Sequence, residues 1–112
     1  IGTDADTTLL TATITKSQAA SALLILATVQ LSHTGNPIDK TVDVKLFRDA
    51  AQLDASYQVR LGTANRTVSD IPATVQAMDT PGAGTYTVSV RARSNGARAQ
   101  ATVRRLTVIE LL

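Results

Sequence analysis

Apolar and polar residues alternate along most of the C-terminal third of the chain, a pattern that predicts β-strands. The dipeptide Asn95-Gly96 interrupts this pattern and is typical of a type I′ hairpin turn, whose two central residues need a positive φ. A turn centred there pairs Val90 with Ala101, and the register separates two faces. The apolar face holds Tyr86, Val88, Val90, Ala92, Ala99, Ala101 and Val103, and the polar face holds Thr87, Ser89, Arg91, Arg93, Arg98, Gln100, Thr102 and Arg104.

The alternation fails at Arg104-Arg105, where an unchanged phase would bury Arg105 and expose Leu106 and Val108. A β-bulge near this dipeptide would restore the phase, because a bulge adds one residue to one strand. The alternative is a last strand that leaves its partner and is covered on both faces. In either case residues 106–112 are too apolar for a free tail, so we expect the C-terminus to be docked.

Further alternating segments bring the total to about eight short strands, expected at residues 9–15, 22–34, 41–48, 57–61 and 74–78 as well as in the C-terminal third. Residues 49–56 are expected to be a connection that could include one helical turn. The run Leu23–Leu26 indicates a strand covered on both faces. Pro72 marks a strand start or an edge, and Pro81-Gly82 predicts a type II turn. This pattern is all-β and fits an antiparallel sandwich or a barrel.

The composition describes one modest domain with a core of small side chains. The chain has 112 residues, of which 44% are hydrophobic and only 3% aromatic. We expect residues 1–8 to form an N-terminal arm and residues 9–112 to form a single domain. A thin core is often supplemented by burial between copies, which predicts an oligomer. The isoleucine at position 1 indicates that the original start precedes it.

The charge distribution and the residue types exclude several classes of partner. Residues 57–112 carry seven arginines against three acids, yet these arginines are not interleaved with aromatic residues as in nucleic-acid binders. We therefore expect a solvated or partner-facing strand surface and no nucleic-acid partner. No apolar run approaches the roughly 18–20 residues of a membrane span. The lack of cysteine excludes disulfides and fits the cytosol, or a particle assembled there, better than a secreted disulfide scaffold.

No pattern indicates catalysis, a cofactor or a metal ion. The only histidine, His33, lies at a predicted strand end without the surroundings of a nucleophile elbow, so we interpret it as a turn residue. Gly82-Ala83-Gly84 precedes a strand, whereas a phosphate-binding loop opens a helix. The protein is therefore predicted not to be an enzyme, and its function is expected to lie in its surfaces.

Candidate interface residues are aromatic or cationic. Phe47 falls on the polar face of its strand. Tyr57 is expected to point inward with Val59 and Leu61, and Tyr86 lies on the apolar face of the hairpin. Aromatic residues are enriched at protein interfaces. Arg93 and Arg98 are expected to face each other across the hairpin tip, where like charges are destabilising. The tip is then either fully solvated or covered by an acidic partner. The candidates are Phe47, Tyr57, Tyr86, Arg91, Arg93 and Arg98.

Two segments resemble a family of small phage virion proteins. They are Asp79-Thr80-Pro81-Gly82-Ala83-Gly84-Thr85-Tyr86-Thr87 and, after an arginine-bearing hairpin, Arg105-Leu106-Thr107-Val108-Ile109-Glu110-Leu111. The family's closing strand has a serine between the arginine and the leucine, and this chain lacks it. The similarity covers about residues 58–111, or half of the chain.

The resemblance implies an antiparallel β-sandwich of the jelly-roll type, similar to the C1q and tumour-necrosis-factor fold. It also implies a homotrimer on the virion, bound to the major capsid protein as a head decoration protein or as the base of a head fibre. A tail-fibre or neck module that recognises a host surface or glycan is the alternative. An immunoglobulin-like sandwich also remains open, although the Cys…Trp…Cys spacing is missing.

Overall fold

A computed structural model describes the backbone of residues 1–112 and every side chain except those of Asp54, Ala55 and Val103. The described chain contains no helix and forms seven strands. They are β1 (Thr7–Lys16), β2 (Ala22–His33), β3 (Thr41–Arg48), β4 (Ala51–Arg60), β5 (Val68–Asp79), β6 (Gly84–Ser94) and β7 (Ala99–Leu111).

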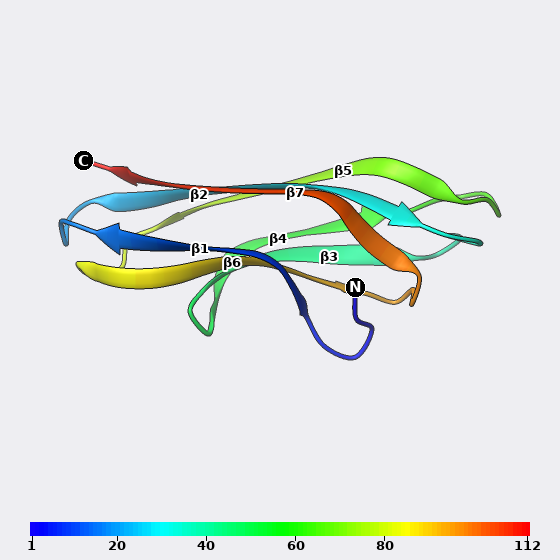
Figure 1. Ribbon diagram of the computed structural model, residues 1–112, viewed down its shortest axis with the longest axis horizontal. Coiled ribbons are helices and arrows are strands. Elements are labelled where there is room, and N and C mark those ends of the chain that lie inside the picture. The colour runs from blue at the N-terminus through cyan, green and yellow to red at the C-terminus, as the bar shows by residue number, and fades with distance from the viewer.

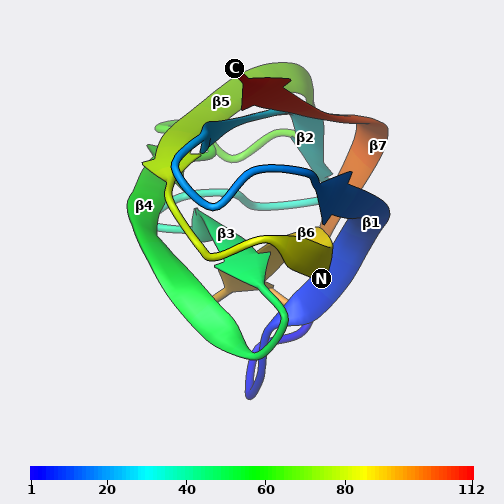
Figure 2. The ribbon, with the colours of Figure 1, turned by 90° about the vertical axis from the view of Figure 1, so that its left-hand side faces the viewer.

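The strands form two packed antiparallel sheets, which confirms the predicted β-sandwich. One sheet has the order β1-β6-β3-β4 and the other the order β5-β2-β7. The molecule is elongated, 50 × 23 × 18 Å, and its strands run roughly along the long axis (Figure 1). Figure 2 shows the sandwich from one end, with the two sheets facing each other. One hydrophobic cluster lies between them.

The core forms where alternating apolar positions of both sheets meet. Each sheet contributes a central strand with an inner face that is almost completely buried, β2 on one side and β6 with β3 on the other. Among the described residues the hydrophobic core cluster is aliphatic, and none of the three aromatic rings belongs to it. The most deeply buried members are Leu23, Ile25, Val29, Leu31, Val42, Leu46, Val88, Val90 and Ala92.

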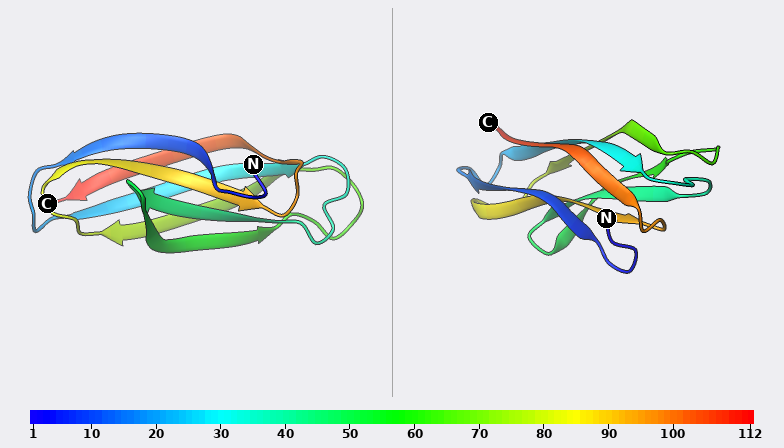
Figure 3. Two further views of the ribbon diagram at one scale, coloured as in Figure 1. Left: turned by 90° about the horizontal axis from the view of Figure 1, so that it is seen from below. Right: turned by 45° about the vertical axis from the view of Figure 1, so that its right-hand side comes forward.

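The predicted hairpin, with a turn at Asn95-Gly96 that pairs Val90 with Ala101, is wrong. β6 pairs with β1 and β3, whereas β7 pairs with β2 in the opposite sheet. Residues 95–98 therefore carry the chain from one layer to the other (Figure 3). The inward positions predicted for Val88, Val90, Ala92, Ala99 and Ala101 are confirmed, while that of Val103 lies outside the described side chains.

The physical reason is that alternation fixes the inward face of a strand and not its neighbour. Two strands with the same alternation can lie side by side in one sheet, or they can face each other across the sandwich with their apolar sides in contact. Neither Asn95 nor Gly96 has the positive φ that a type I′ turn requires, and Gly82 lacks the positive φ of a type II turn. The Asn95 side chain instead accepts a hydrogen bond from the Thr41 amide (2.8 Å) and donates one to the Asp39 carbonyl (3.0 Å).

The predicted β-bulge is confirmed in β7, where Thr102, two residues before Arg104, is the additional residue. Gln30 of β2 pairs with Val103, and Leu31 pairs with Ala101, so Thr102 is the additional residue of β7. After it, Leu106 and Val108 pack against the core and Arg105 is exposed. The C-terminus is docked, because β7 stays paired with β2 as far as Leu111. Pro72 lies in the edge strand β5, as expected.

The expected connection at residues 49–56 is wrong, because β4 begins at Ala51. Asp49 has a φ of 51°, and Arg48 pairs directly with Ala51, so β3 and β4 are joined by a tight two-residue turn. Aspartate tolerates this left-handed conformation better than most residues. The sequence does not indicate the turn, because Asp49-Ala50 lacks the glycine or asparagine that such turns commonly contain.

The neighbours of the central strands match those of the immunoglobulin-like alternative. In those sandwiches the second and fifth strands lie side by side in one sheet, and the third and sixth in the other. The same pairs, β2 with β5 and β3 with β6, occur here. The outer strands differ. β1 lies beside β6 and β7 beside β2, which exchanges the usual places of the first and last strands, and β4 lies beside β3 instead of β5.

Candidate functional site

Phe47 does not present a free aromatic surface. It lies on the outer face of the four-stranded sheet with only 7% of its surface exposed. The Arg91 guanidinium covers the ring at 4.0 Å from its centroid, which is a cation–π contact. Arg91 is held there by hydrogen bonds to the Ser89 hydroxyl and the Asp49 carbonyl. The pair Phe47–Arg91 therefore forms a closed part of the sheet surface.

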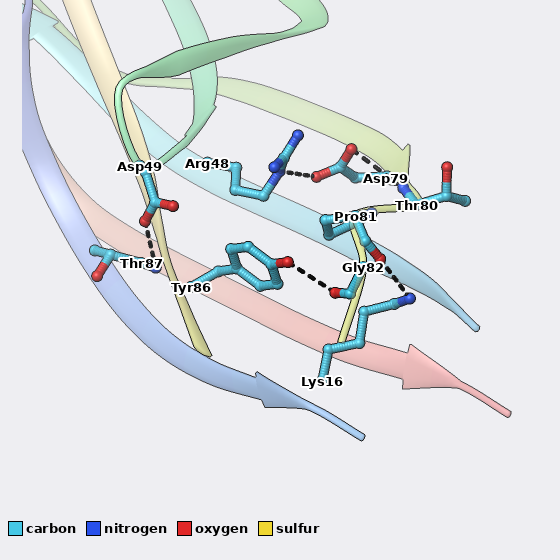
Figure 4. A network of polar contacts seen from close by, with 9 residues as sticks. All are labelled: Lys16, Arg48, Asp49, Asp79, Thr80, Pro81, Gly82, Tyr86 and Thr87. Carbon is cyan, nitrogen blue, oxygen red and sulfur yellow. Dashed lines mark hydrogen bonds and ion pairs between the residues drawn. The ribbon is translucent and has the colours of Figure 1, made fainter. Parts of the chain in front are cut away.

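Tyr86 belongs to a polar cluster at the end of the sandwich where β5 leads into β6 (Figure 4). Its hydroxyl donates to the Gly82 carbonyl at 2.7 Å, and Arg48 lies over its ring. The Arg48 Nε donates in turn to the Asp79 carboxylate at 2.6 Å. The segment that carried the family resemblance is thus fixed by contacts within the chain.

Tyr57 is the most exposed of the three aromatic side chains, with half of its surface accessible. It was expected to point inward with Val59 and Leu61, and those two residues are buried, but Tyr57 is not. β4 is an edge strand, so the sandwich does not cover this position. The inward assignment is correct for Val59 and Leu61 and wrong for Tyr57.

Arg93 and Arg98 do not face each other, because β6 and β7 lie in different sheets. Arg93 donates to the Thr3 carbonyl at 3.1 Å and so fixes the N-terminal segment against the four-stranded sheet. Arg98 lies in the connection between the layers and packs against Gly35. The like-charge conflict predicted for the hairpin tip does not arise.

A buried ammonium group, not anticipated from the sequence, anchors the same end of the sandwich. Lys16 is 1% exposed and lies at the inward position opposite Gly84. Its Nζ donates to the carbonyls of Gln18 (2.7 Å), Ala19 (2.9 Å) and Pro81 (2.6 Å), the last of which is drawn in Figure 4. One side chain thereby ties the β1–β2 loop to the β5–β6 connection. Its signal in the sequence was a lysine in phase with the apolar residues of β1.

Glu110 of β7, in the three-stranded sheet, binds the β1–β2 loop. Its carboxylate accepts hydrogen bonds from the Ser17 and Gln18 amides and from the Ser17 and Ser21 hydroxyls. The hydrogen bonds from Ser21 and the Ser17 amide are the main reason that the pKa of Glu110 falls from 4.5 to about 2. The carboxylate form is thus part of the native structure at neutral pH.

Because the folded protein lowers the pKa of Glu110, its contribution to stability is complete above pH 4.5 and is lost as the pH falls towards about 2. We expect Glu110→Gln to melt below wild type at pH 7, with a difference in Tm that shrinks on acidification and vanishes near pH 2. Thermal unfolding by circular dichroism at a series of pH values measures this. Asp4→Asn, at an exposed N-terminal carboxylate, serves as the control. A pH-independent difference for Glu110→Gln would contradict the assignment.

Apolar side chains also gather on the outer face of the three-stranded sheet. Leu24 pairs with Met78 on one side and with Ile109 on the other, and all three point away from the core. Met78 is 59% exposed and Ile109 is 43% exposed. Together with Leu26 and Leu111 on the same face, they form a contiguous surface that we call the outer apolar row: Leu24, Leu26, Met78, Ile109 and Leu111.

The candidate functional site of this chain is the outer apolar row. Among the described residues, no group of three or more His, Cys, Asp or Glu side chains could hold a metal ion. No helix long and apolar enough to cross a membrane occurs in the described part of the chain. Comparison with protein-family models, curated proteins and solved structures finds no match to this chain.

Proposed function

We propose that this chain is a structural protein of a bacteriophage particle, which assembles as a trimer on the head surface as a decoration or head-fibre protein. The observation that carries the proposal is the outer apolar row. Apolar patches of this kind on a soluble β-protein mark contacts with other protein surfaces. The family resemblance at Asp79–Thr87 and Arg105–Leu111 supplies the virion context.

The core supports an assembly role independently of that resemblance. It is a thin aliphatic layer without any aromatic ring, in a sandwich only 18 Å across its shortest dimension. Covering the outer apolar row would remove further apolar surface from water at about 25 cal/mol per Å². Sister copies around a threefold axis, or the major capsid protein, are the proposed covers.

The alternative, a tail-fibre or neck module that binds a host glycan, has less support. Sugar-binding sandwiches of this kind need an exposed aromatic platform or a carboxylate-bound metal ion. Among the described side chains Phe47 is covered by Arg91, and Tyr86 is engaged with Gly82 and Arg48. Tyr57 is then left as a single exposed ring, which is not a platform.

The proposal predicts that the wild-type protein is a trimer in solution and that Ile109→Thr shifts it towards monomer. The substitution keeps the β-branched shape that a strand prefers and removes apolar contact area. Size-exclusion chromatography with light scattering over a concentration series measures the molar mass. Ile38→Thr is the matched control, because Ile38 is 38% exposed but lies outside the outer apolar row.

We expect Ile38→Thr to keep the mass of the wild type. A wild-type protein that is monomeric at every concentration would remove the trimer. If Ile109→Thr and Ile38→Thr both retained the trimer, the outer apolar row would not be its interface. Binding of the wild-type protein to phage heads stripped of their surface proteins would separate a capsid-binding role from self-association alone.

A further inference from the structure

A small basic pocket lies at the end of the sandwich opposite the Lys16 cluster. It has a volume of about 210 Å³ and is lined by His33, Asn36, Lys40, Gly96, Ala97 and Arg98. These residues come from the end of β2, from the connection to β3 and from the connection between β6 and β7. The topology therefore brings together the only histidine of the chain and two cations that are distant in sequence.

Two glycines make room for the cationic groups of this pocket. A Cβ atom on Gly35 would lie 2.5 Å from Arg98 Nη1, so the guanidinium packs directly on the Gly35 backbone. A Cβ atom on Gly96 would lie 2.8 Å from His33 Nε2 and 3.2 Å from Lys40 Cδ. The imidazole, the lysine stem and the guanidinium are thus placed around two stretches of bare backbone.

The charges of the pocket are uncompensated. Neither Lys40 nor Arg98 takes part in an ion pair between described side chains. His33 is 3% exposed, and its Nδ1 is the one buried side-chain nitrogen or oxygen among the described residues that lacks a hydrogen-bond partner. A buried polar group without a partner is uncommon and costly. The other ring nitrogen, Nε2, lies beside Gly96, which lines the pocket.

The pKa of His33 reflects the same uncompensated positive charges. Burial lowers the pKa of His33 below 6.5, and the positive charges of Lys40 and Arg98 lower it further, while a contact with the Thr34 backbone acts in the opposite direction. Its neighbours across the sheet, Val68 and Ala99, carry no charge. The pocket by itself thus disfavours the imidazolium, and a negative charge inside it would favour it.

We propose that this pocket binds a small oxyanion, with Arg98 and Lys40 as the charged donors and His33 as a third donor at its inner wall. Arginine and lysine are the usual donors to phosphate and carboxylate, and their hydrogen bonds to an anion are about twice as strong as neutral ones. The oxyanion can be a phosphate-type ion from solution or the carboxylate of an acidic side chain of a neighbouring protein. This inference does not depend on the proposed assembly function.

The single histidine provides a direct test by NMR. The His33 ring resonances are followed while inorganic phosphate, sulfate or acetate is added at constant pH and constant ionic strength, with chloride as the balancing ion. We expect a saturable shift and, in a pH titration with sulfate present, a raised pKa of His33. Arg98→Gln and Lys40→Gln should each weaken binding about tenfold, because each removes one charge-assisted hydrogen bond. Arg105→Gln, at an exposed arginine of β7 outside the pocket, should change the affinity less than about twofold.

The type of anion that binds shows whether the natural ligand is a phosphate-type ion or the carboxylate of a neighbouring protein. Saturation by phosphate and sulfate alone would assign the pocket to tetrahedral ions, whereas saturation by acetate as well would assign it to carboxylates, including those of a protein partner. No saturable shift with any of the three at tens of millimolar would overturn the proposal. Shifts that persist unchanged in both Arg98→Gln and Lys40→Gln would overturn it as well, since they would not come from this pocket.

Discussion

Replacing Lys16 with methionine is expected to lower the free energy of unfolding by about 2–4 kcal/mol. Methionine fills a similar volume, so the change isolates the ammonium group from the packing of its stem. The carbonyls of Gln18, Ala19 and Pro81 would lose their common donor at a site that is 1% exposed. Urea unfolding followed by circular dichroism measures the difference from the shift of the midpoint at a constant slope.

Lys45→Met is the matched control for this experiment. Lys45 forms an ion pair with Asp6 at 2.9 Å, but its side chain is 19% exposed and water can replace the lost contact. A surface ion pair of this kind contributes about 0–1 kcal/mol. Equal destabilisation by Lys16→Met and Lys45→Met would show that burial of the Lys16 ammonium does not matter, and would contradict our interpretation of this cluster.

The positions of β2 and β3 could be predicted from the sequence because each of these strands has one inner face, whereas the segments expected at residues 57–61 and 74–78 cover only parts of β4 and β5. The segments at residues 22–34 and 41–48 lie within a residue of the observed β2 and β3. Their alternation reports a property of single strands, namely which side chains avoid water. The alternation does not show which strand lies alongside. We expected β7 beside β6, but β7 lies in the other sheet.

The sequence indicated only part of the outer apolar row. The run Leu23–Leu26 predicted a strand covered on both faces, but the structure buries only the face of Leu23 and Ile25, and Leu24 and Leu26 on the outer face are half-buried. The other members come from β5 and β7, and they join the row only because both strands flank β2. The basic pocket could not be predicted from the sequence. His33, Lys40 and Arg98 lie close together only because the connection between β6 and β7 crosses from one sheet to the other.

The first of the two segments that carry the family resemblance, Asp79–Thr87, is held by contacts within the chain. Asp79 pairs with Arg48, the Pro81 carbonyl accepts from Lys16, and the Gly82 carbonyl accepts from Tyr86. A motif with this role preserves the end of a sandwich and can recur in proteins that display different surfaces. The motif alone is therefore a weak guide to a partner, and the assembly proposal depends on the outer apolar row.

Two neighbouring leucines should separate folding from assembly. Leu23 is fully buried between the sheets, and Leu24 lies on the outer face between Met78 and Ile109. We expect Leu23→Ala to lower the free energy of unfolding by about 2–5 kcal/mol, because it removes buried methyl groups and leaves a cavity. Leu24→Ala should cost about 1 kcal/mol or less in the isolated chain, since its side chain is already partly hydrated.

The same two variants should reverse their order when association is measured. Leu24→Ala removes contact area from the outer apolar row and should shift the proposed trimer towards monomer, whereas Leu23→Ala should weaken association only as far as it unfolds the chain. Urea unfolding at low protein concentration, where mass action favours the monomer, gives the first quantity, and light scattering below the unfolding transition gives the second. The two substitutions are identical in chemistry and adjacent in sequence, so only the face of β2 distinguishes them. If Leu24→Ala left the trimer intact while Leu23→Ala dissociated it without unfolding, the interface would not lie on the outer face of this sheet.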